Sequence, residues 1–401
     1  MKKVLSILLS VAMIVLCFAA CGKTDGDKSS TGKAANVKVG FIFLHDENST
    51  YDKNFITAAE EACKKAGVEI LKKTNISETQ ACYDAAAELV DEGCNVIFAD
   101  SFGHEPYVIQ AAKKFPEVQF LHATGTKAHT EGLSNYHNAF ASIYEGRYLA
   151  GVAAGMKLNE MISSGKITAD KAKMGYVGAY TYAEVISGYT SFYLGAKSVC
   201  PSVTMEVTFT GSWYDETAEK EAAQKLINNG CVLISQHADS MGAPTACEAA
   251  GVPNVSYNGS TVSACPNTFI VSSRIDWAPY LEYAIDCVKN GKAIDTDWTG
   301  TLSTGSVVLT DVNTKAAAEG TQAKIDEVKA ELESGKLHVF DTSAFTVTVS
   351  DSKNKNATVD ADGHLTGYKA DIDSDADNTG DTEVVSDGYF HESEKRSAPC
   401  F

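Results

Sequence analysis

One phrase occurs twice in the sequence and constrains the fold more than any other feature. Residues 226–244 read LINNGCVLISQHADSMGAP, and residues 89–106 read LVDEGCNVIFADSFGHEP. Each runs from a helix end through Gly-Cys into a short apolar stretch and then into polar residues, as a buried parallel strand opening into a loop does. Ligands of open α/β sheets bind beyond such strand ends. The duplication therefore predicts two similar lobes gripping one ligand, and chance reuse of a common α/β phrase is the alternative.

Strand and helix patterns alternate in both halves of the chain. The alternation runs from residue 37 to residue 123 and restarts after a polar connector at 159–172. A helix expected at 277–290 returns to the first lobe, and residues 299–309 are expected to be extended. Alternation at this rate predicts an α/β protein in which each of two Rossmann-like lobes has a parallel sheet covered on both faces.

The returning helix and the extended residues predict a hinge in which the chain crosses between the lobes three times. We expect a β-rich C-terminal extension in which 345–350 pairs as a strand with 359–368. The predicted divisions are lobe 1 at 37–160 plus 277–305, lobe 2 at 161–276 plus 306–344, and an acidic C-terminal extension at 345–401.

The N-terminus has the pattern of an export signal. Lys2 and Lys3 precede an apolar run that ends in Phe18-Ala19-Ala20-Cys21, similar to a bacterial lipobox. Residues 1–21 are therefore predicted to be a lipoprotein signal peptide with Cys21 as the lipidated residue, and 22–36 a flexible tether. We expect an extracytoplasmic protein held on the outer face of the cell membrane by this lipid alone. A cleaved, unlipidated secreted protein is the alternative.

Composition narrows the class of partner. The net charge is −18 over 401 residues, which argues against nucleic acid as a partner. About 365 residues remain after the leader and tether, enough for two domains, and a hydrophobic fraction of 44% supplies their cores. We expect a monomer.

Eleven cysteines occur, and none forms a CxxC pair. This spacing argues against zinc ribbons and thioredoxin-like chemistry. Nine cysteines remain once Cys17 is removed and Cys21 is lipidated. We expect buried free thiols on the apolar faces of helices and strands, which hold Cys63, Cys82, Cys94, Cys231, Cys247 and Cys287.

The acidic stretch 371–381 imitates a calcium loop through the spacing of Asp371, Asp373 and Asp375. Ala376 stands where the turn needs glycine, and Thr382 stands where the loop needs glutamate. A solvated acidic loop is therefore favoured, and we predict neither a metal nor another cofactor.

Catalytic signatures such as GxGxxG, a Walker loop, HExxH and GxSxG are absent from the sequence. His237, Asp239 and Ser240 lie too close together in the chain for a triad, whose members come from separate elements. We therefore do not expect an enzyme.

Aromatic and polar residues gather at the predicted strand ends. Flat rings together with amide, carboxylate and guanidinium groups suit a planar ligand that forms hydrogen bonds, although sugars also stack on rings. Asp52 is in addition expected to cap a helix at 53–66. The candidate ligand-binding residues are Asp46, Tyr51, Asp52, Phe55, Asp100, Ser101, Phe102, Trp213, His237, Asp239, Asn258, Arg274 and Trp277.

The chain resembles the basic membrane protein family, the PnrA-like lipoprotein solute-binding proteins of purine nucleoside ABC importers. The resemblance covers nearly the whole chain and rests on the lipobox, VGFIFLHDENSTYDKNF, YVGAYTYAEVISGYTSFYLGA, GSWYDETAEKEAAQKLINNGC, ISQHADS and VSSRIDWAPYLEYAI. It implies a type I periplasmic-binding-protein fold that closes on a purine nucleoside or nucleobase and presents it to ABC permease subunits.

The resemblance also implies roles for single residues. Phe55 matches the aromatic that stacks on the base, and Asp46 matches a polar contact in the preceding loop. Arg274 falls where many members have lysine. His237, Asp239 and Trp277 match a branch with His-x-Asp-Ser and Trp-x-Pro-Tyr motifs.

Two departures from the family leave the ligand open. Asn258 stands where the family has an aspartate for ribose, and His122 and Thr124 stand where nucleoside binders have a base-reading aspartate. A free purine base is therefore an alternative to a nucleoside. The rival functions are a sugar- or other small-molecule-binding lipoprotein that feeds a sensor, and an exported nucleoside-cleaving enzyme.

Overall fold

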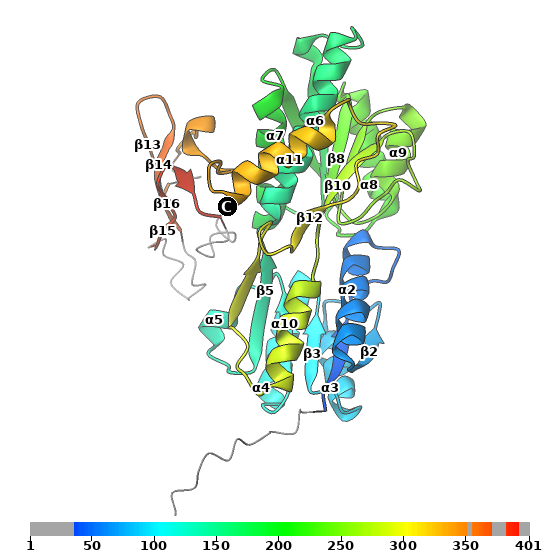
Figure 1. Cartoon of the computed structure of the whole chain (residues 1–401), viewed down its shortest axis with the longest axis vertical. Helices are drawn as coiled ribbons and strands as arrows, with labels where there is room; N and C mark the ends of the chain where they lie inside the picture. The colour runs from blue at the N-terminus through cyan, green and yellow to red at the C-terminus, as the bar shows by residue number, and fades with distance from the viewer. Residues whose placement is uncertain (1–35, 351–354, 371–381, 393–401) are drawn as a thin grey trace, which may run out of the picture. The chain divides into compact units, whose positions relative to one another are not determined.

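A computed structural model of the chain describes residues 36–350, 355–370 and 382–392. Two six-stranded sheets, each covered by helices on both faces, form two lobes (Figure 1). The expectations for the signal peptide, for Cys21, for residues 22–35 of the tether and for the acidic loop at 371–381 lie outside the described residues. The predicted α/β architecture with two lobes is confirmed.

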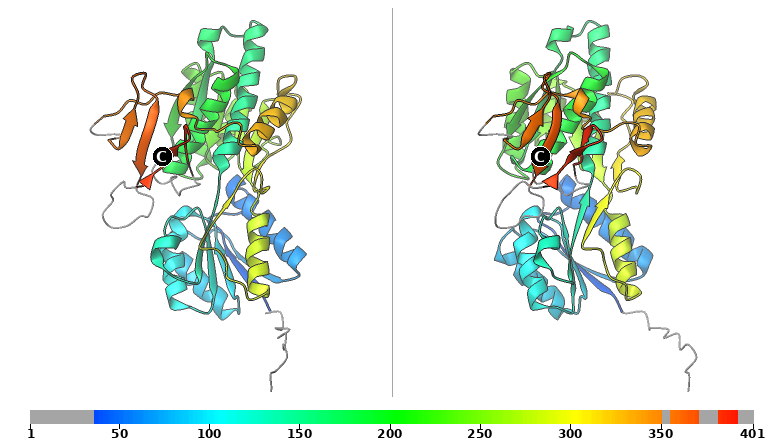
Figure 2. Two further views of the ribbon diagram at one scale, coloured as in Figure 1. Left: turned by 60° about the vertical axis from the view of Figure 1, so that its left-hand side comes forward. Right: turned by 90° about the vertical axis from the view of Figure 1, so that its left-hand side faces the viewer.

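The sheet of lobe 1 has the strand order β11-β5-β4-β3-β1-β2, and every neighbouring pair is parallel. Helices α2 and α10 cover one face and α3 and α4 cover the other (Figure 2). The strands are β1 (Lys38–Ile42), β2 (Glu69–Lys73), β3 (Val96–Ala99), β4 (Gln119–Ala123), β5 (Tyr136–Ala141) and β11 (Asp297–Gly300). The helices are α2 (Thr50–Ala66), α3 (Gln80–Asp91), α4 (Glu105–Lys114), α5 (Ala128–Glu131) and α10 (Ala278–Lys289).

The sheet of lobe 2 has the order β12-β10-β9-β8-β6-β7, and only β12 runs antiparallel to its neighbour among these strands. Helices α6 and α7 cover one face and α8 and α9 cover the other. The strands are β6 (Lys173–Gly178), β7 (Thr204–Phe209), β8 (Leu233–His237), β9 (Asn254–Tyr257), β10 (Phe269–Ile275) and β12 (Val307–Leu309). The helices are α6 (Ile143–Ser163), α7 (Ala183–Val199), α8 (Glu216–Asn228), α9 (Gly242–Ala250) and α11 (Thr321–Glu333).

The chain passes between the two sheets three times, after β5, after β10 and after β11. The crossings bond to one another, because Ser142 N donates to Gly300 O (2.8 Å) and Asp276 N donates to Ser306 O (2.7 Å). The first crossing lies before α6 rather than near residue 160, since α6 packs in the core of lobe 2. Glycines allow that packing: a Cβ on Gly195 would lie 2.0 Å from the backbone oxygen of Tyr148.

Several predicted elements differ from the structure. Ser49, not Asp52, caps α2: its side chain accepts from the backbone N of Asp52, which lies inside the first turn. Strand β5 was not predicted. The predicted strand at 345–350 is not formed; the hairpin of the extension instead pairs β13 (Ala357–Val359) with β14 (Leu365–Ala370).

The described part of the extension is β-rich, as expected. Strand β15 (Thr382–Glu383) joins β14, and β16 (Val385–Ser386) pairs with β17 (Tyr389–Phe390). These strands contact the second lobe's side of the hinge through Phe340, whose ring lies 5.2 Å from that of Tyr144 and 6.3 Å from that of Phe390.

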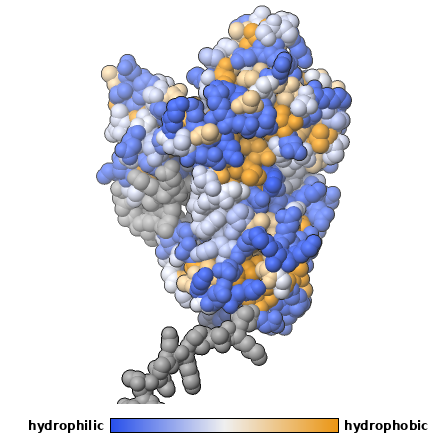
Figure 3. All heavy atoms as spheres, in the orientation of Figure 1, coloured by the Kyte–Doolittle hydropathy of each residue, from blue (hydrophilic) through white to orange (hydrophobic). Residues whose placement is uncertain are grey.

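Polar residues dominate the face of the molecule drawn in Figure 3, and apolar residues occur there in small groups. This agrees with a net charge of −18. In the described part of the chain, no helix combines the length and the apolar character that a membrane crossing needs.

Candidate functional site

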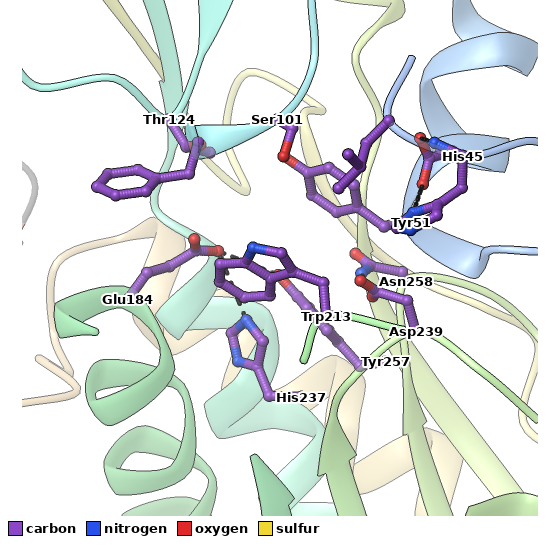
Figure 4. A pocket seen from close by; sticks show the side chains of 13 residues that line it. His45, Tyr51, Ser101, Thr124, Glu184, Trp213, His237, Asp239, Tyr257 and Asn258 are labelled. Carbon is purple, nitrogen blue, oxygen red and sulfur yellow. Dashed lines mark hydrogen bonds and ion pairs between the residues drawn. The ribbon is translucent and has the colours of Figure 1, made fainter. Parts of the chain in front are cut away.

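A cavity lies where the carboxyl ends of the two sheets face each other, so the two copies of the duplicated strand-end loop contribute to one site. Every side chain that lines it follows or ends a strand, or lies in the helix turn just beyond (Figure 4). Lobe 1 contributes Leu44, His45, Tyr51, Asp52, Ser101, Phe102 and Thr124, and lobe 2 contributes Glu184, Trp213, His237, Asp239, Tyr257 and Asn258.

The cavity is narrow. About 20 Å³ within it can take the centre of a water molecule. This volume is close to that of a single water and far below that of a small-molecule site. Side chains from both lobes thus divide the space, and a ligand of heterocycle size enters only when the lobes or these side chains move apart.

A buried carboxyl group orders the lobe 1 wall. Asp52 accepts hydrogen bonds from His45 N (2.8 Å) and Ser49 Oγ (2.5 Å). Burial alone would raise the pKa of Asp52, but these bonds and the His45 ring outweigh it and lower that pKa. Behind it, burial and the neighbouring Asp52 raise the pKa of Asp100 well above its usual range. Tyr51 is held in place because its hydroxyl donates to Asp100 O (2.7 Å).

The lobe 2 wall combines an acid, an imidazole and a phenol. Glu184 Oε1 accepts from the Tyr257 hydroxyl (3.4 Å) and lies 3.8 Å from His237 Nε2. Burial raises the pKa of Glu184 to about 7. Burial and the Arg147 guanidinium lower the pKa of His237 well below its usual range, so this ring is neutral at pH 7. Arg147 itself is fully buried behind the wall, 4.8 Å from the Tyr257 ring centroid.

Asp239 connects the two lobes. Its side chain accepts from Asn258 Nδ2 (3.0 Å), and its backbone oxygen accepts from Thr50 N (3.1 Å) and Thr50 Oγ1 (3.3 Å) at the start of α2. Burial and Glu219 raise the pKa of Asp239 well above its usual range. Asn258 adopts a left-handed backbone conformation (φ 65°), which asparagine tolerates better than most residues.

Aromatic rings surround the edge of the cavity. Tyr180 lies 5.1 Å from Trp213 and 5.1 Å from Tyr182, measured between ring centroids. Tyr182 in turn lies 5.4 Å from Phe102 of the other lobe. Phe102 and Tyr182 are 38% and 44% exposed, so they border solvent while Trp213 lines the interior.

The structure brings together eight of the predicted residues as cavity lining: Tyr51, Asp52, Ser101, Phe102, Trp213, His237, Asp239 and Asn258. Asp100 lies directly behind this layer, because its Oδ1 accepts from Leu44 N (3.1 Å).

Four predicted residues do not line the cavity. Phe55 and Trp277 are buried against each other in the core of lobe 1, with ring centroids 4.5 Å apart. Arg274 borders a separate polar groove, 3.9 Å from Asp276, and Asp46 bonds to Asn48 within its own loop. The family-based roles of these residues are therefore not supported by their positions, since core packing and local loop bonding occupy their side chains.

Five lining residues were not among the candidates: Leu44, His45, Thr124, Glu184 and Tyr257. The strand-end rule could have found most of them, because Leu44 and His45 lie in the loop after β1, Thr124 directly follows β4 and Tyr257 ends β9. Glu184 needed a further step, since it is placed by the first turn of α7.

The described residues contain neither a cluster suited to bind a metal ion nor an exposed cysteine thiol. No group of three or more His, Cys, Asp or Glu side chains there could hold a metal ion. The eight cysteines that the structure describes are all buried and unpaired. Burial raises the pKa of Cys63 to about 12, so its thiol is unreactive at neutral pH.

Comparisons with known proteins agree with this geometry. The family model described as "ABC transporter substrate-binding protein PnrA-like" matches residues 40–337. A purine-binding protein of Brucella abortus is 30% identical over 310 residues, which cover 76% of this chain and 83% of that protein. A protein of Haloferax volcanii, provisionally named as an ABC transporter glucose-binding protein, is 27% identical over 332 residues, covering 80% of this chain and 78% of that protein.

Solved structures show the same architecture. An ABC transporter solute-binding protein of Conexibacter woesei superposes with a TM-score of 0.63 at 21% identity, covering 75% of this chain and 98% of that one. One of Aeropyrum pernix gives a TM-score of 0.63 at 17% identity, with coverage of 79% and 95%. At these identities the likeness shows the fold alone, and it confirms the fold predicted from the sequence.

Proposed function

Because the chain belongs to the PnrA-like family of ABC transporter substrate-binding proteins, we propose that it captures a purine nucleobase or nucleoside between its lobes. It then delivers this ligand to ABC permease subunits outside the cytoplasmic membrane. The purine-binding protein of Brucella abortus supports the ligand class, at 30% identity.

The observation that carries the proposal is the composition of the cavity wall. Trp213 and Tyr51 offer ring surface, while Asp239, Asn258 and Glu184 offer hydrogen-bonding groups from the opposite lobe or beside the ring. Stacking plus hydrogen bonds to ring edges is how proteins recognise planar bases. The lining is therefore suited to a flat heterocycle.

Closure follows from the placement of these groups in two lobes. A ligand that contacts Tyr51 and Asp239 together favours the arrangement in which the lobes approach, and its differential affinity shifts the population toward that state. The three crossings, which bond to one another, would serve as the hinge in this proposal. Thr50 of lobe 1 donates a hydrogen bond to the backbone oxygen of Asp239 of lobe 2, so the two lobes are in direct contact beside the cavity.

A sugar is the second candidate ligand, because the Haloferax relative carries a glucose-binding name. Rings beside hydroxyl-bonding carboxylates also suit sugars. Isothermal titration calorimetry with adenine, adenosine and glucose separates the two. Binding of a purine at micromolar or lower Kd, with glucose inert, supports the proposal, and the reverse order overturns it.

We propose that the protein is a monomer anchored by a lipid on Cys21, and that it binds its ligand without cleaving it. Mass spectrometry of the mature N-terminus tests the anchor. Chromatography of adenosine after prolonged incubation tests turnover, and release of free adenine would contradict a pure binding role.

A further inference from the structure

Hydrogen-bond donors at the cavity are largely used within the protein. The Tyr51 hydroxyl donates to Asp100 O (2.7 Å), the Ser101 hydroxyl to Glu78 Oε1 (2.6 Å) and the Tyr257 hydroxyl to Glu184 Oε1 (3.4 Å). Asn258 Nδ2 donates to Asp239 Oδ1 (3.0 Å). These four hydrogens are therefore not available to a ligand.

Three carboxyl groups line the cavity, and Glu184 is the least occupied of them. Both oxygens of Asp52 already accept from His45 and Ser49, and Asp239 Oδ1 accepts from Asn258. Within the described part of the chain, Glu184 accepts only from Tyr257.

Among the described residues that line the cavity there is no lysine or arginine. Arg147 is sealed behind the wall and Arg274 borders another groove. The cavity thus lacks a cation to pair with a negatively charged ligand, and Glu184 can accept a hydrogen bond from a ligand donor.

Glu184 is the acid best placed to read such a ligand. It lies in the first turn of α7 and is 20% exposed, and Figure 4 shows its carboxylate pointing toward the Trp213 ring. Its Oε1 is occupied by Tyr257, which orients the group and leaves Oε2 for a ligand. The helix is held close to β8 at this point, because a Cβ on Gly188 would lie 2.8 Å from His237 Nδ1.

We propose that Glu184 is a specificity-determining residue whose carboxylate accepts a hydrogen bond from an amino group of a heterocycle stacked on Trp213. The inference rests on the proposed function and narrows it to an uncharged, amino-substituted purine without phosphate. Hydrogen bonds to a charged acceptor are stronger than neutral ones, so loss of the amino group is expected to be felt strongly.

Matched ligand pairs test the inference by calorimetry. Adenine is compared with 6-methylpurine, in which a methyl group of similar size replaces the amino group, and guanine is compared with hypoxanthine. We expect the wild-type protein to favour the amino member of at least one pair more than tenfold. Adenosine 5′-monophosphate is expected to bind more than 100-fold more weakly than adenosine.

Two variants assign the preference to Glu184. In Glu184→Ala the amino preference is expected to fall below threefold, and in Glu184→Gln, which keeps the size of the side chain, to an intermediate value. Glu221→Gln makes the same charge change on an exposed position of α8 and is expected to leave the preference unchanged. Urea unfolding checks that each variant is folded.

The outcomes separate the two proposals. Purine binding without an amino preference, or with a preference that survives in Glu184→Ala, overturns the role of Glu184 and leaves the proposed function standing. Tight binding of the monophosphate overturns the uncharged ligand class. Failure of every purine to bind overturns both the inference and the function on which it rests.

Discussion

Phe55 and Trp277 lie nearly face to face in lobe 1, with ring centroids 4.5 Å apart and an angle of 19° between their planes. Both side chains are buried outside the cavity lining, and they join α2 to the start of α10. We expect Phe55→Ala to lower the free energy of unfolding by about 3–5 kcal/mol, the usual cost of emptying an aromatic core site. Urea denaturation measures this loss.

The same variant is expected to bind its ligand with less than about a fivefold change in Kd once corrected for the folded fraction. The Tyr51 ring packs at 4.9 Å against Phe55, which accounts for a small indirect effect. A large loss of affinity with unchanged stability would restore Phe55 as a stacking residue.

Replacing Trp213 is expected to weaken ligand binding more than it lowers stability, because the ring lines the cavity and is only partly buried. Trp213→Ala is predicted to weaken binding by about 1–3 kcal/mol, as loss of one base–aromatic stack does. Its stability should fall by no more than about 1 kcal/mol. Calorimetric titration beside urea denaturation provides both numbers, and unchanged affinity would count against the stacking surface.

Local rules in the sequence predicted much of the cavity lining. Ser101, His237, Asp239 and Asn258 all end strands or lie in the loops just after them, and the periodicity that marks a strand also marks where its end must lie. Two parallel sheets bring such ends to one edge, so the meeting of these residues was predictable without coordinates.

The expectations that differ from the structure all depend on packing between segments that are distant in the sequence. Phe55 occupies a helix position from which it could face either a ligand or Trp277, which lies far away in the sequence. Helix α6 was assigned to the first lobe because nothing local shows that its glycines meet the backbone of α7. Glu184 was missed for a similar reason, since only the fold brings it to Tyr257.

Arg147 bonds to four strands of the lobe 2 sheet from its place on α6. Its Nη2 donates to the Tyr176 hydroxyl and to Gln236 O (3.1 Å), and its Nη1 donates weakly to Ser256 O (3.4 Å) and Ser273 Oγ (3.5 Å). Arg147→Ala leaves these buried acceptors without a donor. We expect a loss of about 2–5 kcal/mol in the free energy of unfolding, measured in urea.

Ligand affinity should fall in Arg147→Ala as well, because the guanidinium supports the ring of Tyr257 from behind. Lys157→Ala on the same helix is the control: it removes a part-buried pair with Glu160 and should cost about 1 kcal/mol, less than the loss of Arg147. Equal stability of Arg147→Ala and wild type would mean that the cost of burying the guanidinium offsets all of its bonds.

The pKa of Glu184, raised by burial to about 7, makes ligand affinity depend on pH. Below pH 7 the carboxyl group is protonated and loses the charge that strengthens a bond from a ligand amino group. Affinity should therefore rise between pH 5.5 and pH 8.5, by about three- to thirtyfold. The groups that face Glu184 are Tyr257, His237, Arg147, Asp239 and Tyr51.

Stability should show the opposite slope in the unliganded protein. The folded state holds the Glu184 proton up to about pH 7, whereas the unfolded state releases it near its ordinary pKa of 4.5. The contribution of this group to the free energy of unfolding therefore falls as the pH rises through that window. Titration calorimetry and urea denaturation across the range measure the two slopes, and both should flatten in Glu184→Gln.

Glu219 is a second acid whose pKa burial raises to about 7, but it does not line the cavity. Glu219→Gln is therefore the control for the pH dependence of ligand affinity. If this dependence is unchanged in Glu184→Gln but flattens in Glu219→Gln, it arises from Glu219 and not from the bond between Glu184 and the ligand.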